Sequence, residues 1–231
     1  MPFHRTSKRR VNQYISLKAV FFACVICLLA SFSGAAQADS SSVSPFLTVN
    51  AVKVGKPFKF IPKAAVLQGE SQIVKHNSRQ DQLWKQLLVY VSGKTQVQKM
   101  QLVNRFFNNV AYVADPQDTW LAPATFVERG GDCEDFVIAK YHALKLMGFT
   151  PDQLRVALVQ NTISKAQHAV LLVSIDNVSY VLDNQFAKVR SLSEVGHYQP
   201  IATFNEQSLW VHYKGNGTLQ KLASVNQKFS G

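Results

Sequence analysis

The sequence predicts an α+β fold in which helices come first along the chain and an antiparallel sheet follows. Between residues 79 and 147, apolar residues recur with the period of about 3.6 that is typical of helices. Between residues 154 and 213, short runs rich in β-branched and aromatic residues alternate with polar turns. Helices followed by strands, instead of alternating with them, indicate an α+β domain. We therefore expect N-terminal helices packed on an antiparallel sheet.

Residues 1–38 have the three parts of a signal peptide. An apolar run, AVFFACVICLLA, occupies residues 19–30, and AQA at residues 36–38 offers small side chains for cleavage after Ala38. An uncleaved membrane anchor is the alternative, but the run is shorter than the roughly 20 residues that a bilayer span needs. The basic leader before the run contains Arg5, Lys8, Arg9, Arg10 and Lys18. We expect an exported mature protein that begins at Asp39 and is not inserted in a membrane.

Charge and composition argue against a nucleic-acid partner. The whole chain has 25 Lys and Arg against 14 Asp and Glu, and loss of the leader lowers its net charge from +11 to +6. The remaining basic residues are scattered, whereas nucleic-acid-binding proteins gather them on one face with aromatic residues for stacking. We therefore exclude nucleic acid as a partner.

The mature chain divides into an arm and one domain. Residues 39–78 are rich in Ser, Pro, Lys and Gly with weak periodicity, so we expect a linker and an irregular N-terminal arm that carries one short strand and packs little. Residues 79–231 form the domain. Its first helix, DQLWKQLLVYV, is expected to place Leu83, Leu87 and Tyr90 on one face.

A second helix is predicted after Gly93, and a loop follows it. The second helix would bury Val97, Met100, Val103 and Phe107. The loop ADPQDTWLAP, residues 114–123, breaks the helical period with its two prolines and presents Trp120, which either lines a cleft or packs in the core.

The central helix is predicted from Cys133 to Met147, with Gly148 as its stop. Its apolar stripe would contain Val137, Tyr141 and Leu144. The strands expected after it are LRVALVQ (154–160), HAVLLVSI (168–175), SYVLDNQ (179–185) and one or two within IATFNEQSLWVHY (201–213).

Cys133 is the thiol that remains once Cys24 and Cys27 leave with the leader. A lone cysteine cannot form an intramolecular disulfide or a multi-cysteine zinc site. The start of a helix stabilises a thiolate, but the carboxylates of Asp132, Glu134 and Asp135 would raise the pKa of the thiol unless a cation neutralises them. A histidine imidazolium and a metal ion are the two obvious sources of that positive charge.

His168 and Asp183 are candidates to form a catalytic triad with Cys133, in which Cys133 is the nucleophile, His168 the base and Asp183 the acid that orients the base. His168 opens one predicted strand and Asp183 ends the next, so an antiparallel pairing could bring them side by side. Residue types alone make a weak case, because most such residues are structural or solvated. His142, nine residues after Cys133 on the same helix, is expected on the surface. The helix-start position of the thiol and the strand-initial position of His168 favour the triad.

The segments GGDCEDFVIAKY, DTWLAP, HAVLLV and YVLDNQ resemble the bacterial transglutaminase-like cysteine proteinases, and in particular adhesin-processing proteases of the LapG type. The resemblance covers most of residues 80–215. It implies a papain/transglutaminase-like cysteine protease core with Cys133 as nucleophile, His168 as general base and Asp183 as the residue that orients His168. It also implies that Asp132 and Glu134, with Asp135, bind Ca²⁺. Ala122 departs from the threonine that usually precedes the loop proline.

The same resemblance implies a biological role. It suggests a periplasmic, calcium-dependent cysteine endopeptidase that cleaves a large surface adhesin near its N-terminus and so promotes biofilm dispersal. An inner-membrane receptor for cyclic di-GMP would sequester the protease. Two other functions remain open from the residues: transglutaminase-type acyl transfer, which uses the same acyl-enzyme, and a non-catalytic calcium-dependent binding module.

Overall fold

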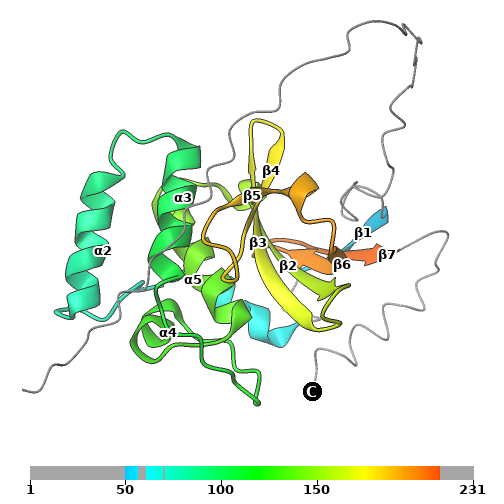
Figure 1. Cartoon of the computed structure of the whole chain (residues 1–231), viewed down its shortest axis with the longest axis horizontal. Coiled ribbons are helices and arrows are strands. Elements are labelled where there is room, and N and C mark those ends of the chain that lie inside the picture. Colours follow the sequence, from blue (N-terminus) through cyan, green and yellow to red (C-terminus); the bar gives the residue numbers. More distant parts are fainter. Residues whose placement is uncertain (1–49, 57–60, 70, 214–231) are drawn as a thin grey trace, which may run out of the picture. The chain divides into compact units, whose positions relative to one another are not determined.

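A computed structural model describes residues 50–56, 61–69 and 71–213 (Figure 1). The predicted signal peptide at residues 1–38 and the first part of the arm lie outside the described residues. None of the helices in the described ranges is long and apolar enough to cross a membrane.

A seven-stranded antiparallel sheet forms in the described part of the chain, and its strand order is β1-β7-β6-β2-β3-β4-β5. The predicted strands are all present, so the α+β prediction is confirmed. The single strand predicted in the arm is β1, which adds to the edge of the sheet beside β7. The strands are β1 (Asn50–Gly55), β2 (Leu154–Asn161), β3 (Gln167–Ile175), β4 (Val178–Leu182), β5 (Arg190–Ser191), β6 (Tyr198–Phe204) and β7 (Leu209–Tyr213).

The helices gather on one side of the sheet, as Figure 1 shows. The α-helices are α2 (Arg79–Tyr90), α3 (Gln96–Phe107), α4 (Pro123–Arg129) and α5 (Cys133–Leu146). Short 3₁₀ helices are η3 (Pro62–Leu67), η4 (Pro151–Gln153) and η5 (Leu192–Glu194). The sequence did not predict α4, because a helix of seven residues is too short to display a period, and its N-cap, Ala122, has no side-chain oxygen to mark a helix start.

Helix α5 is buried around most of its circumference. It packs against β3 and β2 on one side, and against α3, α4 and η3 on the others. The predicted stripe of Val137, Tyr141 and Leu144 is buried. The expectation that His142 lies on the surface is wrong, because its side chain is 3% exposed and its Nε2 lies 2.9 Å from the Val66 carbonyl oxygen.

The N-terminal arm is what covers His142. We expected residues 39–78 to pack little, and for residues 61–74 this is wrong, because Ile61, Leu67, Ile73 and Val74 are at most 3% exposed and join the main core. The weak periodicity of the arm reflects its irregular backbone and not a lack of burial. The arm therefore seals the side of α5 that an isolated domain would leave in water.

The buried face of α2 also differs from the prediction, whereas that of α3 agrees with it. Met100, Val103 and Phe107 of α3 are fully buried. On α2 the buried side chains are Asp81 and Trp84, and the Trp84 ring lies 5.6 Å from that of Phe106, while Leu83 and Tyr90 are 46% and 59% exposed. The large indole ring decides which face of α2 meets α3.

This assignment predicts a contrast between neighbouring residues of α2. Trp84→Ala should lower the free energy of unfolding by about 3–5 kcal/mol, because it leaves a large cavity between α2 and α3. Leu83→Ala should change it by less than about 0.5 kcal/mol. Urea unfolding of the two variants measures both values, and an equal loss in both would mean that α2 packs through the other face.

Candidate active site

The thiol of Cys133 lies at the first position of α5, and the two glycines before it explain how the chain turns there. Gly130 has a φ of +80°, which favours glycine. A Cβ on Gly131 would lie 2.1 Å from Asp135 Oδ2, because the Asp135 carboxylate folds back over the turn. That carboxylate accepts hydrogen bonds from the backbone N–H of Leu121 at 2.7 Å and of Asp132 at 3.2 Å. Asp135 therefore ties the Trp120 loop to the helix start that carries Cys133.

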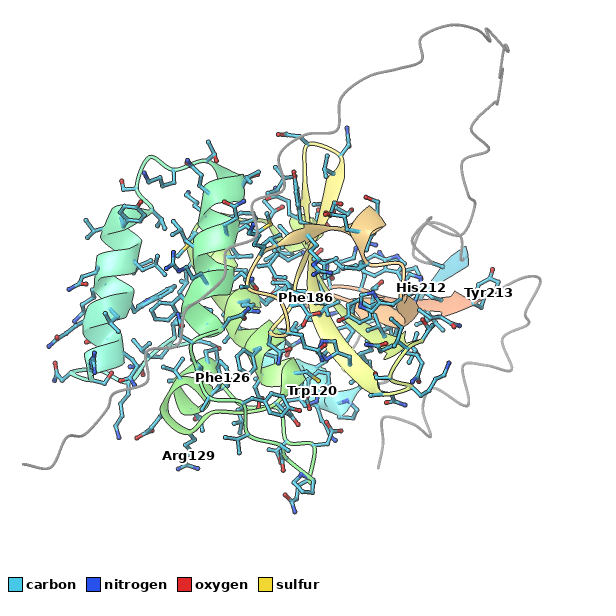
Figure 2. All side chains as sticks on the ribbon, viewed as in Figure 1. Trp120, Phe126, Arg129, Phe186, His212 and Tyr213 are labelled. Atoms are coloured by element: carbon cyan, nitrogen blue, oxygen red, sulfur yellow. The ribbon has the colours of Figure 1, made fainter. Side chains whose placement is uncertain are left out.

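Cys133 and His168 line the same pocket, which has a volume of about 220 Å³. Trp120, which Figure 2 labels, also lines the pocket. Its ring stacks on that of Phe204 at 5.9 Å, so it contributes both to the pocket wall and to the packing beneath it. The remaining polar lining is mostly acidic and contains Asp115, Asp118, Asp132 and Glu134.

His168 and Asp183 form a buried pair, as the strand pattern suggested. His168 Nε2 lies 2.9 Å from Asp183 Oδ1, and the two residues are 7% and 1% exposed. Leu171 of β3 pairs with Leu182 of β4, so Asp183, one residue beyond this pair, lies diagonally across from His168. The imidazole Nδ1 is thus the nitrogen not engaged by Asp183.

Asp183 has two further donors. The Tyr198 hydroxyl donates to Oδ2 at 2.6 Å, and the Gln185 N–H donates to Oδ1 at 2.9 Å. Burial alone would raise the pKa of Asp183, but the hydrogen bond and charge of His168, with the bonds from Tyr198 and Gln185, lower it below its ordinary value. The carboxylate is therefore ionised although it is buried.

The thiol of Cys133 donates to a neighbouring acid. Its Sγ lies 3.2 Å from Glu134 Oε2. Burial, then the Glu134 carboxylate, raises the pKa of the thiol, while the Ala169 N–H, next to His168 in sequence, acts in the opposite direction. In the absence of a cation among the acids, the cysteine is a neutral thiol beside the start of β3.

The acids around the thiol lie too close together for all of them to be ionised without a cation. Burial, then the contacts with Asp118 and Asp132, raises the pKa of Glu134 to about 9. Burial likewise raises the pKa of Asp132, and its Oδ1 is buried without a hydrogen-bond partner in the described part of the chain. Lys63 of η3 forms an ion pair with Asp118 at 2.6 Å. One lysine does not balance the four carboxylates that line the pocket.

These carboxylates fit a calcium ion in donor chemistry. Calcium prefers carboxylate and carbonyl oxygens, and the unpartnered Asp132 Oδ1 is such a donor. Among residues 50–56, 61–69 and 71–213, no three acidic, histidine or cysteine side chains are already arranged around one point as a metal site. Of the three acids expected to bind the metal, Asp132 and Glu134 line the pocket, whereas Asp135 binds backbone N–H groups.

Sequence reasoning missed Tyr198 and Lys63. Tyr198 is the first residue of β6 and reaches Asp183 across the sheet, and Lys63 comes from the arm that was expected to pack little. Neither residue lies in a motif, so the chain itself offers no signal for them. Asp118 lies in the loop at residues 114–123 that also presents Trp120, and it lines the pocket.

Comparisons with known proteins agree on one family. The model of the bacterial transglutaminase-like cysteine proteinase family (BTLCP) matches residues 73–218. Among solved structures, Legionella pneumophila LapG is 26% identical, with a TM-score of 0.55 over 77% of this chain and 99% of LapG. No curated protein matches the chain.

Two further structures of Legionella pneumophila LapG also match. The calcium-bound form is 27% identical, with a TM-score of 0.54 over 74% of this chain and 97% of that chain. The EGTA-treated form is 26% identical, with a TM-score of 0.55 over 77% of this chain and 100% of that chain.

The contacts of Asp183 generate a prediction for Tyr198. Tyr198→Phe removes the donor to Oδ2 and should lower the free energy of unfolding by about 1–3 kcal/mol, because the buried carboxylate loses a charge-assisted bond. Tyr180→Phe, on β4, is the matched control and should lower it by less than about 0.5 kcal/mol. Chemical denaturation compares the two, and an unchanged stability in Tyr198→Phe would show that this bond contributes nothing.

Proposed function

Because the chain belongs to the bacterial transglutaminase-like cysteine proteinases, we propose that Cys133, His168 and Asp183 are the catalytic triad of this cysteine protease. One observation carries the proposal: His168, which is paired with the buried Asp183, lines the same pocket as a thiol at the start of a helix. Base, orienter and nucleophile come from three different elements. Apolar residues at these positions would stabilise the core at least as well, so the polar residues indicate a function.

In the proposed reaction, Cys133 Sγ attacks the carbonyl carbon of a peptide bond while His168 Nδ1 takes the thiol proton. Asp183 holds the imidazole and stabilises its charged form. Backbone N–H groups at the start of α5 would stabilise the oxyanion. His168 then gives the proton to the leaving amine, which produces a thioester on Cys133. A water molecule activated by His168 hydrolyses the thioester and frees the thiol.

We propose Ca²⁺ as the cofactor, with Asp132 and Glu134 as ligands and Asp115 and Asp118 as further candidates. A calcium-bound structure is known for the similar LapG protein, and the unpartnered Asp132 oxygen supports the same chemistry here. When bound, the ion would neutralise the carboxylates beside the thiol. Asp135, which we expected to be a third ligand, would then act by fixing the loop through Leu121 and Asp132.

The substrate and setting are proposed from the family resemblance. We propose that the mature protein acts in the periplasm, cleaves a large surface adhesin near its N-terminus and so promotes biofilm dispersal. An inner-membrane cyclic di-GMP receptor would restrain it by sequestration. Incubation of the mature chain with N-terminal adhesin fragments, followed by mass measurement of the products, tests the reaction. A new amine adduct in place of two hydrolysis fragments would favour acyl transfer.

Three substitutions test the roles of the triad residues in that assay. Cys133→Ala should fold normally and cleave nothing, because the nucleophile is absent. Asp183→Ala should retain more activity than His168→Ala, since it loosens the orientation of the base but leaves the base in place. Circular dichroism provides the control for folding. Cleavage by folded Cys133→Ala would remove this residue as the nucleophile.

Chelation tests the metal assignment. EGTA should abolish cleavage and lower the melting temperature, and added calcium should restore both. Glu134→Gln should lose most of the calcium-dependent rise in melting temperature, while Glu128→Gln, an exposed acid paired with Lys75, should keep it. Full activity in EGTA, without any effect of calcium on the melting temperature, would contradict the assignment.

A further inference from the structure

Lys140 is a fully buried lysine that the proposed reaction does not use. It lies on α5 seven residues after Cys133 and is 0% exposed. Burying an amine is unfavourable unless it is paired, and an apolar side chain of similar length would pack there without that cost. We therefore expect Lys140 to bind a buried polar group.

The partner of Lys140 is Asn104 on the neighbouring helix α3. Lys140 Nζ donates to Asn104 Oδ1 at 2.8 Å, and Asn104 is also 0% exposed. The amide of Asn104 then donates to the carbonyl oxygen of Phe186 at 3.2 Å and lies 3.5 Å from that of Ala187. The lysine thus connects the helix that carries the thiol to the segment that follows β4.

That segment, residues 183–187, begins with Asp183. Asn108, one turn after Asn104, donates to the Asp183 carbonyl oxygen at 2.9 Å and to that of Phe186 at 3.0 Å. Figure 2 labels Phe186, which lies between the helices and the sheet. The segment has no strand partner of its own, so these amides bind its carbonyl oxygens, while the Phe186 ring contacts His197 and Arg190.

Charge links the same groups. Burial lowers the pKa of Lys140 to about 7, and the Asp183 carboxylate acts in the opposite direction by favouring the charged amine. The lysine is thus linked through Asn104 to the carbonyl oxygens of Phe186 and Ala187, in the segment that begins with Asp183.

We propose that Lys140 is a positioning residue of the active site, which with Asn104 fixes residues 183–187 so that Asp183 stays aligned with His168. This role rests on the proposed triad. It explains why a core helix position next to aromatic and aliphatic residues has an amine. Lys140 touches no reacting atom and acts through Asn104 and Asp183.

The test replaces both polar partners at once. Removing only one leaves a buried polar atom unpaired, whereas replacing both with apolar groups of similar shape can be nearly neutral for stability. We therefore choose the double variant Lys140→Met with Asn104→Leu in the full mature chain. Lys145→Met is the matched control, because it removes a lysine from the same helix and breaks a 2.5 Å ion pair with Glu206.

Two readouts need no peptide substrate, so they are separate from the test of proteolysis. The first is the downfield imidazole N–H resonance of His168 in protein labelled with ¹⁵N-histidine, assigned by its loss in His168→Ala. The second is the rate of alkylation of Cys133 by iodoacetamide. The folded double variant should shift or lose the resonance and react about tenfold more slowly, since small misplacements of catalytic groups have large effects on rate. Lys145→Met should match the parent in both.

An unchanged resonance and alkylation rate in the folded double variant would overturn the proposal. If the double variant does not fold, Lys140→Met alone is read in the same way. Unfolding of both would also contradict the proposal, because the pair would then serve the stability of the core and not the alignment of Asp183. The double variant could lose the resonance although the parent protein cleaves no peptide. That outcome would support the positioning role of Lys140 and Asn104 and would count only against the proposed function.

Discussion

A charged carboxylate at 1% exposure is the constraint on which the rest of the site depends. Asp183 is ionised in the core only because His168, Tyr198 and the Gln185 N–H all donate to it. These donors come from β3, from β6 and from the segment after β4, so the sheet must bring distant parts of the chain to one point. The cost of leaving such a charge unpaired makes this convergence obligatory for a stable fold.

At the start of α5 the environment acts in the opposite way, because it disfavours the anionic form of Cys133. Helix geometry favours an anion at Cys133, yet burial and then the neighbouring acids raise the pKa of the thiol. Lys63 offsets only part of that charge. We propose that the site is complete when a divalent cation binds to these acids. Helix α5 connects the thiol to the His168–Asp183 pair, because it begins at Cys133 and its Lys140 reaches residues 183–187 through Asn104.

The sequence was informative wherever a pattern is local. Strand alternation, the helix start at Cys133 and the strand-initial His168 could be recognised without a structure, and the α+β fold followed from their order. The buried His142, the face of α2 and the packed arm could not be recognised, because each depends on a partner far away in the chain: Val66 for His142, and Phe106 for Trp84. Tyr198 and Lys140 were missed for the same reason, since nothing near them in sequence marks a buried polar contact.

The proposed function depends above all on a covalent bond that Cys133 forms with the substrate during cleavage. Acid quenching of the calcium-loaded chain during turnover of an adhesin fragment, followed by peptide mapping of the intact adduct, measures this directly. The account predicts a thioester on Cys133 with the mass of the fragment N-terminal to the cut. An adduct on any other side chain would contradict it.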